Sequence, residues 1–497
     1  MPQPDRPASP ANRARRSLTR AGLIAGAAGI VGVFAADRLL GEGHAAAHVR
    51  RSGHDVNRYV SRPDLVPPKL TVVHRGAGTS PGLLFLGPSS GPGQRGAMIV
   101  DDTGEPVWFH PTVPQTVMNL RAGLYRGKPV LTWWEGKTKH GLGVGDHVIF
   151  DSSYRELARF PPGNDRGSDL HELILTPAGT ALITAYDIPA VDRSSVGHGR
   201  GRVIEGIVQE LEVPSARVLF EWRSLDHVAL TESYSQVAPA FDYFHVNSVG
   251  IAADGNLLVS ARNTWTVYKV DRESGKVIWR LGGKKSDFAM GPGTKFSWQH
   301  DARSIGSGEL LTLFDNADDP QEEPQSRGLA LALDENRMRA TLSREYLHRP
   351  PLLAHAFGSV QVQPNGNVLV GWATQPWYTE YTAAGAVVLD AKLPYGGQNY
   401  RTLRFPWSGT PAEPPRIASR PAPTGHFVYA SWNGATDVHS WQALAGPHPD
   451  ALIPRVTAPR SGFETMVALP ADAGPYVAMA ALDMTGKPLR RSAVIRL

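Results

Sequence analysis

Three histidines recur at related places in a repeated strand unit, and imidazole is the side chain best suited to nucleophilic and acid–base chemistry near neutral pH. The three segments read DLHEL, FHVNSV and WQHDA. Counting back eight residues from the turn glycine of five successive units reaches Asn119, His171, Asn247, His300 and Gly358. His245 precedes Asn247 by two residues, so both side chains point to the same side of an extended strand. The repeat therefore predicts a shared site formed by His171, His245 and His300.

Two kinds of chemistry are compatible with three imidazoles in one site. Neutral imidazole nitrogens from several strands bind a metal and leave positions open for substrate. Alternatively, one imidazole is a nucleophile and the others transfer protons, while Asn247 and Arg262 bind an anionic group. Arg262 favours the second chemistry, because a fixed cation repels a divalent metal and its planar fork suits tetrahedral oxyanions.

Composition excludes several classes of protein. The chain of 497 residues has no cysteine, which excludes disulfides, thiolate metal sites and a cysteine nucleophile. Its net charge of +5 belongs mostly to residues 1–47, which hold six arginines and three acidic residues. The remainder has 45 of the 51 basic and 43 of the 46 acidic residues, so it is close to neutral. We therefore do not expect it to bind nucleic acid.

Residues 1–47 are expected to be a twin-arginine signal peptide. Arg15 and Arg16 precede the weakly hydrophobic run AGLIAGAAGIVGVFAA, and Ala45–Ala47 form a plausible cleavage site. The alternative is a single N-terminal membrane anchor. Both interpretations place the rest of the protein outside the cytoplasm, with the Tat translocase as a partner during export and membrane contact only through an uncleaved leader.

The rest of the chain is expected to be all-β in two domains. Residues 48–66 look like a linker, and over 67–408 a unit of about four short strands repeats six times. Such a repeat is typical of a β-propeller, here with six blades and the histidine strands innermost; a seven- or eight-bladed ring with one degenerate blade is the alternative. Residues 409–424 form a Pro-rich linker. In residues 425–497 apolar and polar residues alternate, as in the strands of a small β-sandwich of immunoglobulin or fibronectin type. Trp432 and Trp441 are expected in the core of this sandwich.

At its histidine motifs the chain resembles the arylsulfate sulfotransferases, exported bacterial enzymes with a six-bladed propeller. The resemblance spans about residues 66–405. It rests on four motifs in the family's order: DLHELILTPAGTALIT, FDYFHVNSVGIAADGNLLVSARNT, DRESGKVIWRLGG and WQHDARSIGSGELLTLFDN. It implies transfer of a sulfuryl group from an aryl sulfate ester to a phenol, without a nucleotide sulfate donor, metal or organic cofactor.

The resemblance also implies roles for individual residues. His300 falls at the family's transiently sulfated histidine, and His171 and His245 fall at its acid/base and sulfuryl-binding histidines. Arg262 joins these three as a catalytic residue. Where some members have a threonine late in the propeller, this chain has Gly358 or Ser359, and the disulfide of those members is absent. The residues assigned to substrate binding are Asn247, Ser359, Phe244 and Trp298.

Two other functions remain open at the level of sequence. One is a metal-dependent lyase or oxygenase on a histidine-lined propeller, which a metal analysis would reveal. The other is a non-catalytic extracellular propeller that binds a polymer or a partner. Three imidazoles in register argue against the second, because a binding surface has no need of them.

The leader generates the first prediction. Replacing both arginines, Arg15→Lys with Arg16→Lys, should leave folded protein in the cytoplasm, because the translocase reads the arginine pair. Immunoblots of cytoplasmic and extracytoplasmic fractions measure the distribution. An unchanged extracytoplasmic yield would contradict the assignment.

Overall fold

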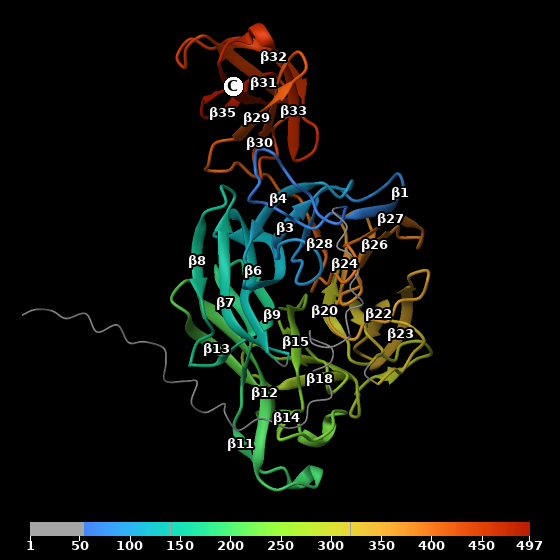
Figure 1. The fold of residues 1–497 in the computed structure, drawn as a ribbon. Helices are drawn as coiled ribbons and strands as arrows, with labels where there is room; N and C mark the ends of the chain where they lie inside the picture. The colour runs from blue at the N-terminus through green and yellow to red at the C-terminus, as the bar shows by residue number, and fades with distance from the viewer. Residues whose placement is uncertain (1–53, 140, 319) are drawn as a thin grey trace, which may run out of the picture. The chain divides into compact units, whose positions relative to one another are not determined.

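The structure is a computed structural model that describes residues 54–497, except 140 and 319 (Figure 1). The described residues are all-β: they form strands and four short 3-10 helices, with no α-helix among them. The expected signal peptide lies outside the described residues. Within the described part, no helix is long and apolar enough to cross a membrane.

Six sheets follow one another along residues 71–405, and their strands are antiparallel except for the pairs β12–β14 and β19–β23. The first sheet contains β28 (Leu403–Phe405), β2 (Leu83–Leu86), β3 (Gly96–Val100) and β4 (Pro106–Pro111). The second contains β5 (Thr116–Tyr125), β6 (Lys128–Lys139), β7 (Leu142–Asp151) and β8 (Glu156–Phe160). The third contains β9 (Gly167–Leu175), β10 (Thr180–Asp187), β11 (Ala190–Val191), β12 (Gly201–Glu212), β13 (Arg217–Arg223) and β14 (Ala240–Asp242).

The remaining three sheets repeat the same order of strands. The fourth contains β15 (Val246–Ile251), β16 (Leu257–Ala261), β17 (Thr266–Val270) and β18 (Val277–Gly282). The fifth contains β19 (Ala289–Met290), β20 (His300–Ile305), β21 (Leu310–Asp315), β22 (Arg327–Asp334) and β23 (Arg339–Tyr346). The sixth contains β24 (Ser359–Val362), β25 (Val368–Gly371), β26 (Trp377–Tyr381), β27 (Val387–Lys392) and β1 (Thr71–Arg75). Three 3-10 helices connect strands: η3 (Ser194–Val196), η4 (Ser224–Asp226) and η5 (Leu230–Glu232).

Neighbouring sheets contact one another through the first strand of each repeat. In order, β5, β9, β15, β20 and β24 each contact strands of the preceding sheet, and β24 and β25 also contact β28 of the first sheet. Strands such as β16 and β17 are buried along their whole length, because each sheet has a neighbour on both faces. Strand β2, near the start of the repeat region, pairs with β28 from its far end.

The turn glycines explain the eight-residue spacing of the sequence pattern. Gly255 has a φ of +85°, in the left-handed region that glycine adopts without strain, and lies in the turn between β15 and β16. The equivalent glycines Gly179 and Gly366 have φ of +79° and +85°. Counting back from such a turn therefore reaches the same end of each first strand.

Residues 416–496 form two further sheets. One contains β29 (Arg416–Ala422), β30 (Gly425–Ser431) and β33 (Glu464–Pro470). The other contains β32 (Ile453–Pro459), β31 (Ser440–Gly446), β34 (Tyr476–Leu482), β35 (Pro488–Arg491) and β36 (Ile495–Arg496), with η6 (Ala471–Ala473) before β34. Residues of both sheets share one buried cluster, which contains Trp432 and Trp441. In β33 buried and exposed residues alternate, as in a strand with one face on a core.

Both segments that the sequence assigns to linkers contain ordered contacts. Residues Arg416–Ala422 of the Pro-rich segment form β29, an edge strand paired only with β30, where Pro421 is tolerated because one side of the strand needs no hydrogen bond. In the earlier segment Leu65 is buried, and the Ser61 backbone N–H donates to the Glu464 carboxylate (2.6 Å). The pattern of apolar and polar residues predicted neither strand β29 nor the contacts of Ser61 and Leu65.

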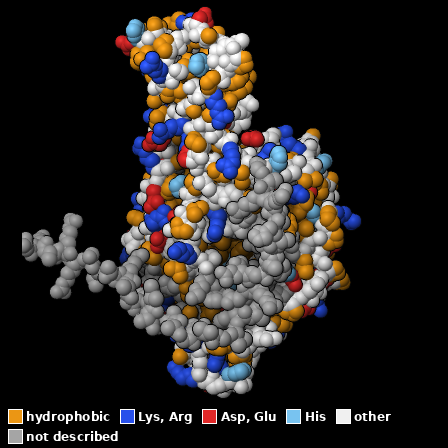
Figure 2. Space-filling model, viewed as in Figure 1, with side chains coloured by type: hydrophobic (Ala, Val, Ile, Leu, Met, Phe, Trp, Pro, Cys, Tyr) orange, Lys and Arg blue, Asp and Glu red, His pale blue; other side chains and the backbone are white. Residues whose placement is uncertain are grey.

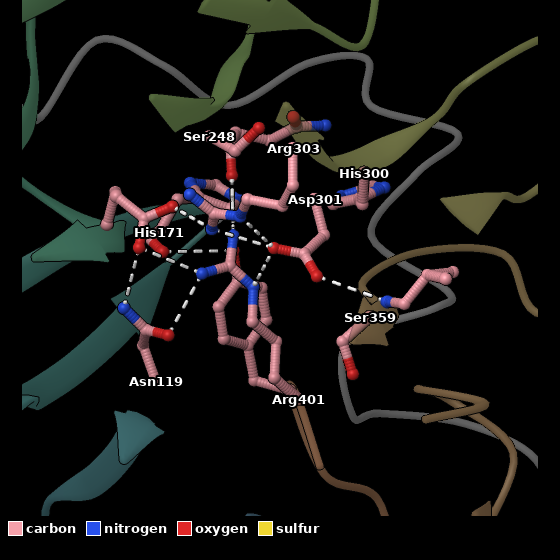
Figure 3. A network of polar contacts seen from close by, with 12 residues as sticks. Asn119, His171, Ser248, His300, Asp301, Arg303, Ser359 and Arg401 are labelled. Carbon is pink, nitrogen blue, oxygen red and sulfur yellow. Dashed lines mark hydrogen bonds and ion pairs between the residues drawn. The ribbon is translucent and has the colours of Figure 1, made fainter. Parts of the chain in front are cut away.

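A largely buried network of five charged side chains joins the first strands of the repeats (Figure 3). We call it the central ion network; its members are Arg121, Glu172, Asp301, Arg303 and Arg401. Arg401 donates from Nη1 to Glu172 (3.0 Å) and to Asn119 (2.9 Å). Arg303 donates to Glu172 and, from Nε, to Asp301 (2.8 Å).

The same network reaches the first strands of five sheets and, through Arg401, the segment that precedes β28 of the first sheet. Arg401 Nη2 donates to the Asn247 carbonyl in β15 (3.2 Å), and the Val360 N–H in β24 donates to Asp301 (3.1 Å). Arg401 itself lies two residues before β28. Burial raises the pKa of Glu172, but Arg303, Arg401 and Arg121 lower it more, to about 2. Glu172 is therefore ionised at neutral pH.

The network generates a stability prediction. Glu172→Gln should lower the free energy of unfolding by about 3–5 kcal/mol at pH 7, because it leaves three guanidinium groups opposite a single carboxylate. The difference should shrink as the pH falls from about 4.5 towards 2, because in this range Glu172 takes up a proton in the unfolded chain but not yet in the folded protein, which lowers the stability of the wild type. Urea unfolding at several pH values measures both effects.

Glu212 provides a matched control. Its pKa is also lowered to about 2, by Arg217 and Ser215, but its side chain lies at the surface and is 46% exposed. Glu212→Gln should leave the unfolding midpoint unchanged, because solvent screens exposed ion pairs. Equal effects of the two substitutions would contradict the role given to the central ion network.

Candidate active site

The three predicted histidines come together. The ring centroids of His171 and His245 are 5.3 Å apart, and those of His171 and His300 are 6.2 Å apart. His171 lies in β9, His300 begins β20, and His245 directly precedes β15 with a φ of +53°. His171 and His300 are buried, whereas His245 is partly exposed.

Hydrogen bonds fix the protonation pattern of His300. Its Nδ1 lies 2.7 Å from Asn316 Oδ1 and 3.1 Å from the Trp298 carbonyl, which are both acceptors, so Nδ1 carries the proton. The Phe357 backbone N–H donates to Nε2 (3.2 Å), which therefore carries the lone pair. Burial, followed by the charges of His171 and Arg262, lowers the pKa of His300 well below its ordinary value. His300 is thus a neutral imidazole whose lone pair is on Nε2.

A carboxylate orients each of the other two imidazoles. His171 Nδ1 lies 2.9 Å from both oxygens of Asp169, and His245 Nδ1 lies 2.5 Å from Asp242. Burial lowers the pKa of His171, and the negative charge of Asp169 opposes that effect. With Nδ1 held in this way, each imidazole presents Nε2 for proton transfer.

Arg262 is adjacent to the histidine cluster. Its backbone N–H donates to the His245 carbonyl (3.0 Å). Its guanidinium lies 4.7 Å from the ring centroid of Trp298 and donates to Asn263 (2.9 Å). Asn247 donates to the Gln299 carbonyl (2.6 Å), and its buried Oδ1 has no partner among the described residues. Both residues predicted beside the histidines therefore lie there.

Two predicted substrate contacts have other surroundings. The Ser359 hydroxyl donates to the Thr402 carbonyl (3.1 Å) and accepts from the Thr402 N–H (3.2 Å), so it joins β24 to the segment before β28. Phe244 lies in the core among Trp222, Tyr243 and Tyr268. At Gly358, where other repeats carry a polar residue, a Cβ would lie 2.2 Å from the ring of Phe314. The Phe314 ring therefore occupies the space that a side chain at position 358 would need.

A small cavity adjoins His171 and His245. Its volume is about 10 Å³, and it is also lined by Asp169, Glu205 and Asp242. This is room for about one water molecule, so a larger ligand must displace residues that surround the histidines. Gly141, at the turn between β6 and β7, is one of them: a Cβ there would lie 3.4 Å from His245 Cε1.

Several residues of the site have no counterpart in the sequence prediction. They are Asp169, Asp242, Asn316, Phe357 and Tyr400. The Tyr400 hydroxyl donates to the carbonyls of His171 (3.1 Å) and Asn247 (3.2 Å) beneath the imidazoles. The two aspartates precede their histidines by two and three residues, a proximity that could have identified them. Asn316 and Tyr400 carry no such signal.

The geometry defines a site for nucleophilic and acid–base chemistry on an anionic group, and the family follows from comparison. A family model described as Arylsulfotransferase (ASST) matches residues 121–393, more than half of the chain, including all three histidines and Arg262. The chain therefore belongs to the arylsulfotransferase family. Membership supports arylsulfotransferase activity in general. No curated protein sequence matches the chain.

Solved structures show only distant similarity. A protein of unknown function from Bacteroides caccae is 14% identical with a TM-score of 0.42, covering 65% of this chain and 98% of its own. A streptogramin B lyase is 13% identical with a TM-score of 0.35, covering 73% and 93%. A virginiamycin B lyase from Staphylococcus aureus is 10% identical with a TM-score of 0.34, covering 73% and 96%.

The residues described by the structure contain no group of three or more His, Cys, Asp or Glu arranged to hold a metal ion. Each histidine Nδ1 is already engaged by a protein acceptor. Chelation remains a useful test, because it distinguishes a metal-dependent reaction directly.

The Asp169–His171 pair generates a prediction that needs no assay of activity. Asp169→Asn should lower the pKa of His171, because it removes the negative charge that favours the imidazolium form. NMR titration of protein labelled with ¹⁵N-histidine measures this value, with His171→Gln to assign the signal. The exposed Asp334→Asn serves as control and should leave the titration unchanged. A higher pKa of His171 in Asp169→Asn would contradict the arrangement.

Proposed function

We propose that this protein is an exported arylsulfotransferase that moves a sulfuryl group from an aryl sulfate ester to a phenol. The transfer is ping-pong, passes through a sulfohistidine at His300 and uses no nucleotide sulfate donor. The observation that carries the proposal is the neutral His300, with its lone pair on Nε2, beside two carboxylate-oriented imidazoles and the Arg262 guanidinium.

In the first half-reaction His300 Nε2 attacks the sulfur of the bound ester. The N–S bond forms as the S–O bond to the aryl group breaks, and the electron pair of that bond leaves with the phenolate oxygen. His171 or His245 donates a proton from Nε2 to this oxygen. The approaching sulfate favours the required imidazolium form, because an anion raises the pKa of a neighbouring imidazole.

In the second half-reaction an acceptor phenol loses its proton to the same imidazole. A free phenol has a pKa of about 10, so it needs this base to become nucleophilic. The phenol oxygen attacks sulfur, the N–S bond breaks and neutral His300 is restored. The imidazole thus regains from the acceptor phenol the proton that it gave to the leaving phenolate.

Positive and polar donors stabilise the charge on the sulfuryl oxygens. Arg262 supplies a guanidinium next to the histidines. The Phe357 N–H, which donates to His300 Nε2, becomes available when Nε2 bonds to sulfur, and it then lies beside a sulfuryl oxygen. This backbone donor fills the role expected of a side chain at Gly358 or Ser359.

The fold that would carry this chemistry is a closed six-bladed β-propeller followed by a β-sandwich. Contacts between successive first strands and the β2–β28 pairing support the closed ring. The cluster shared by the two C-terminal sheets supports the sandwich. Within such a ring His171, His245 and His300 face the central channel.

The twin-arginine leader supports an extracytoplasmic location, with the Tat translocase as partner during export and membrane contact only through an uncleaved leader. Small aryl sulfates and phenols are the proposed substrates. Nucleic acid is not a proposed partner, since basic side chains are scattered among acidic ones on the face shown in Figure 2.

The mechanism generates a prediction about leaving groups. His300→Ala should abolish transfer from every aryl sulfate, because it removes the nucleophile. His171→Ala and His245→Ala should retain more activity with 4-nitrophenyl sulfate than with phenyl sulfate, because an acidic phenol leaves without a general acid. Arg262→Ala should slow transfer by about ten- to a thousandfold. Steady-state assays with several donors, with and without an added phenol, measure these effects.

Three results would contradict the proposal. They are full activity of His300→Ala, a loss of activity on chelation that added metal restores, and initial-rate patterns that require donor and acceptor to bind together. Tyr395→Leu, at a side chain 86% exposed to solvent, is the control for general effects of substitution.

A further inference from the structure

A row of three aromatic side chains leads away from the histidine cluster. We call it the aromatic row; it consists of Trp298, Trp265 and Tyr234. Trp298 meets Trp265 edge to face (5.3 Å between ring centroids), and Trp265 stacks flat on Tyr234 (3.7 Å, 6° between planes). Trp298 is buried, whereas Trp265 and Tyr234 are partly exposed, so one end of the row is accessible to solvent.

The inner end of the row adjoins the reacting groups. The Trp298 carbonyl accepts from His300 Nδ1 (3.1 Å), and the Arg262 guanidinium lies over the Trp298 ring. At the outer end the Lys284 ammonium lies 4.8 Å from the Tyr234 ring centroid. A ring that binds along the row is therefore directed towards His300.

The backbone at both tryptophans is in an uncommon conformation. Trp265 has a φ of +50° and Trp298 a φ of +55°, in the left-handed region that bulky side chains seldom adopt. Such conformations persist only where the surroundings over-determine them, and they cluster at ligand sites. The fold thus holds both indoles in place at a cost in backbone energy.

Both indole N–H groups lack a hydrogen-bond acceptor. Trp265 Nε1 and Trp298 Nε1 are buried and have no partner among the described residues. Buried indole N–H groups usually find an acceptor. Two unpaired donors, one of them on the indole that the Arg262 guanidinium covers, point to an oxygen atom supplied by a ligand.

We propose that the aromatic row binds the aryl ring of the substrate and that the indole N–H groups donate to an oxygen substituent on that ring. The proposal deepens the proposed function and rests on it. It assigns phenols with a second oxygen-bearing group, such as a carboxylate, as the preferred substrate class, with Trp265 and Tyr234 as determinants of specificity.

Equilibrium binding tests the proposal separately from catalysis. Isothermal titration calorimetry compares 4-hydroxybenzoate with 4-ethylphenol, which has the ring but lacks the second oxygen group. Wild-type protein should bind 4-hydroxybenzoate more tightly. Trp265→Leu and Tyr234→Leu should weaken both ligands by about tenfold, because the stacking surface is lost. Trp265→Phe keeps a ring without the N–H, and should weaken 4-hydroxybenzoate by about threefold or more without affecting 4-ethylphenol.

Tyr395→Leu is the matched control and should change neither dissociation constant. The proposal is overturned if wild-type protein binds neither ligand, or if Trp265→Phe and Tyr234→Leu leave both constants unchanged. These two variants decide the matter if Trp265→Leu fails to fold. Binding that depends on Trp265 without any sulfuryl transfer would support the aromatic row and contradict the proposed function, so the two failures are distinguishable.

Discussion

The central ion network is the interaction on which the rest of the structure depends. Glu172, Asp301 and Arg401 are buried, and Arg121 and Arg303 partly buried, where the first strands of five sheets meet the segment before β28. The histidine cluster lies on or next to three of these strands. Arg401, which reaches Asn119, Glu172 and the Asn247 carbonyl, comes from the segment just before β28. The network is therefore complete only when the last strand has paired with β2 near the start. This long sequence separation couples the arrangement of the site to closure of the whole repeat region.

The charge of the network also governs the chemistry above it. Three guanidinium groups face two carboxylates, and Arg262 adds a further cation near the histidines. Burial is the main cause of the lowered pKa values of His171 and His300, and Arg401 and Arg262 respectively add to it. Neutral imidazoles supply a lone pair for attack. The Arg262 guanidinium gives an anionic ligand a cation close to His300, and such a ligand in turn favours imidazolium at the group that is proposed to donate a proton.

Orientation of the imidazoles depends on partners outside the network. Asp169 and Asp242 accept from the histidines that are proposed to transfer protons, whereas neutral Asn316 accepts from the proposed nucleophile. A carboxylate favours the imidazolium form of its partner, and an amide does not. The difference between these partners therefore separates the roles of chemically identical side chains.

Much of the site could be predicted because hairpin geometry connects the turn glycine to the first strand of each repeat. That spacing identified His171, Asn247 and His300. His245 was added because residues two apart in an extended strand point to the same side. The equivalent positions in two other repeats do not contribute to the histidine cluster. The Phe314 ring fills the space next to Gly358, and Asn119 accepts a hydrogen bond from Arg401 of the central ion network.

Residues recruited from distant segments could not be found in this way. Arg401 and Tyr400 follow the last repeat, and no spacing connects them to Glu172 or His171. Strand β29 was obscured by the prolines of its sequence, which an edge strand tolerates. The resemblance to a family supplied the reaction class, which strand patterns alone do not contain.

The central claim is that His300 carries the sulfuryl group between donor and acceptor. Its most direct test is a short incubation with 4-nitrophenyl sulfate without acceptor, followed by rapid quenching, proteolysis and mass spectrometry at a pH that preserves sulfohistidine. The account predicts one added sulfuryl group on the peptide that contains His300, and its disappearance when a phenol is added before quenching. A modification on another residue, or active enzyme that never carries the group, would contradict it.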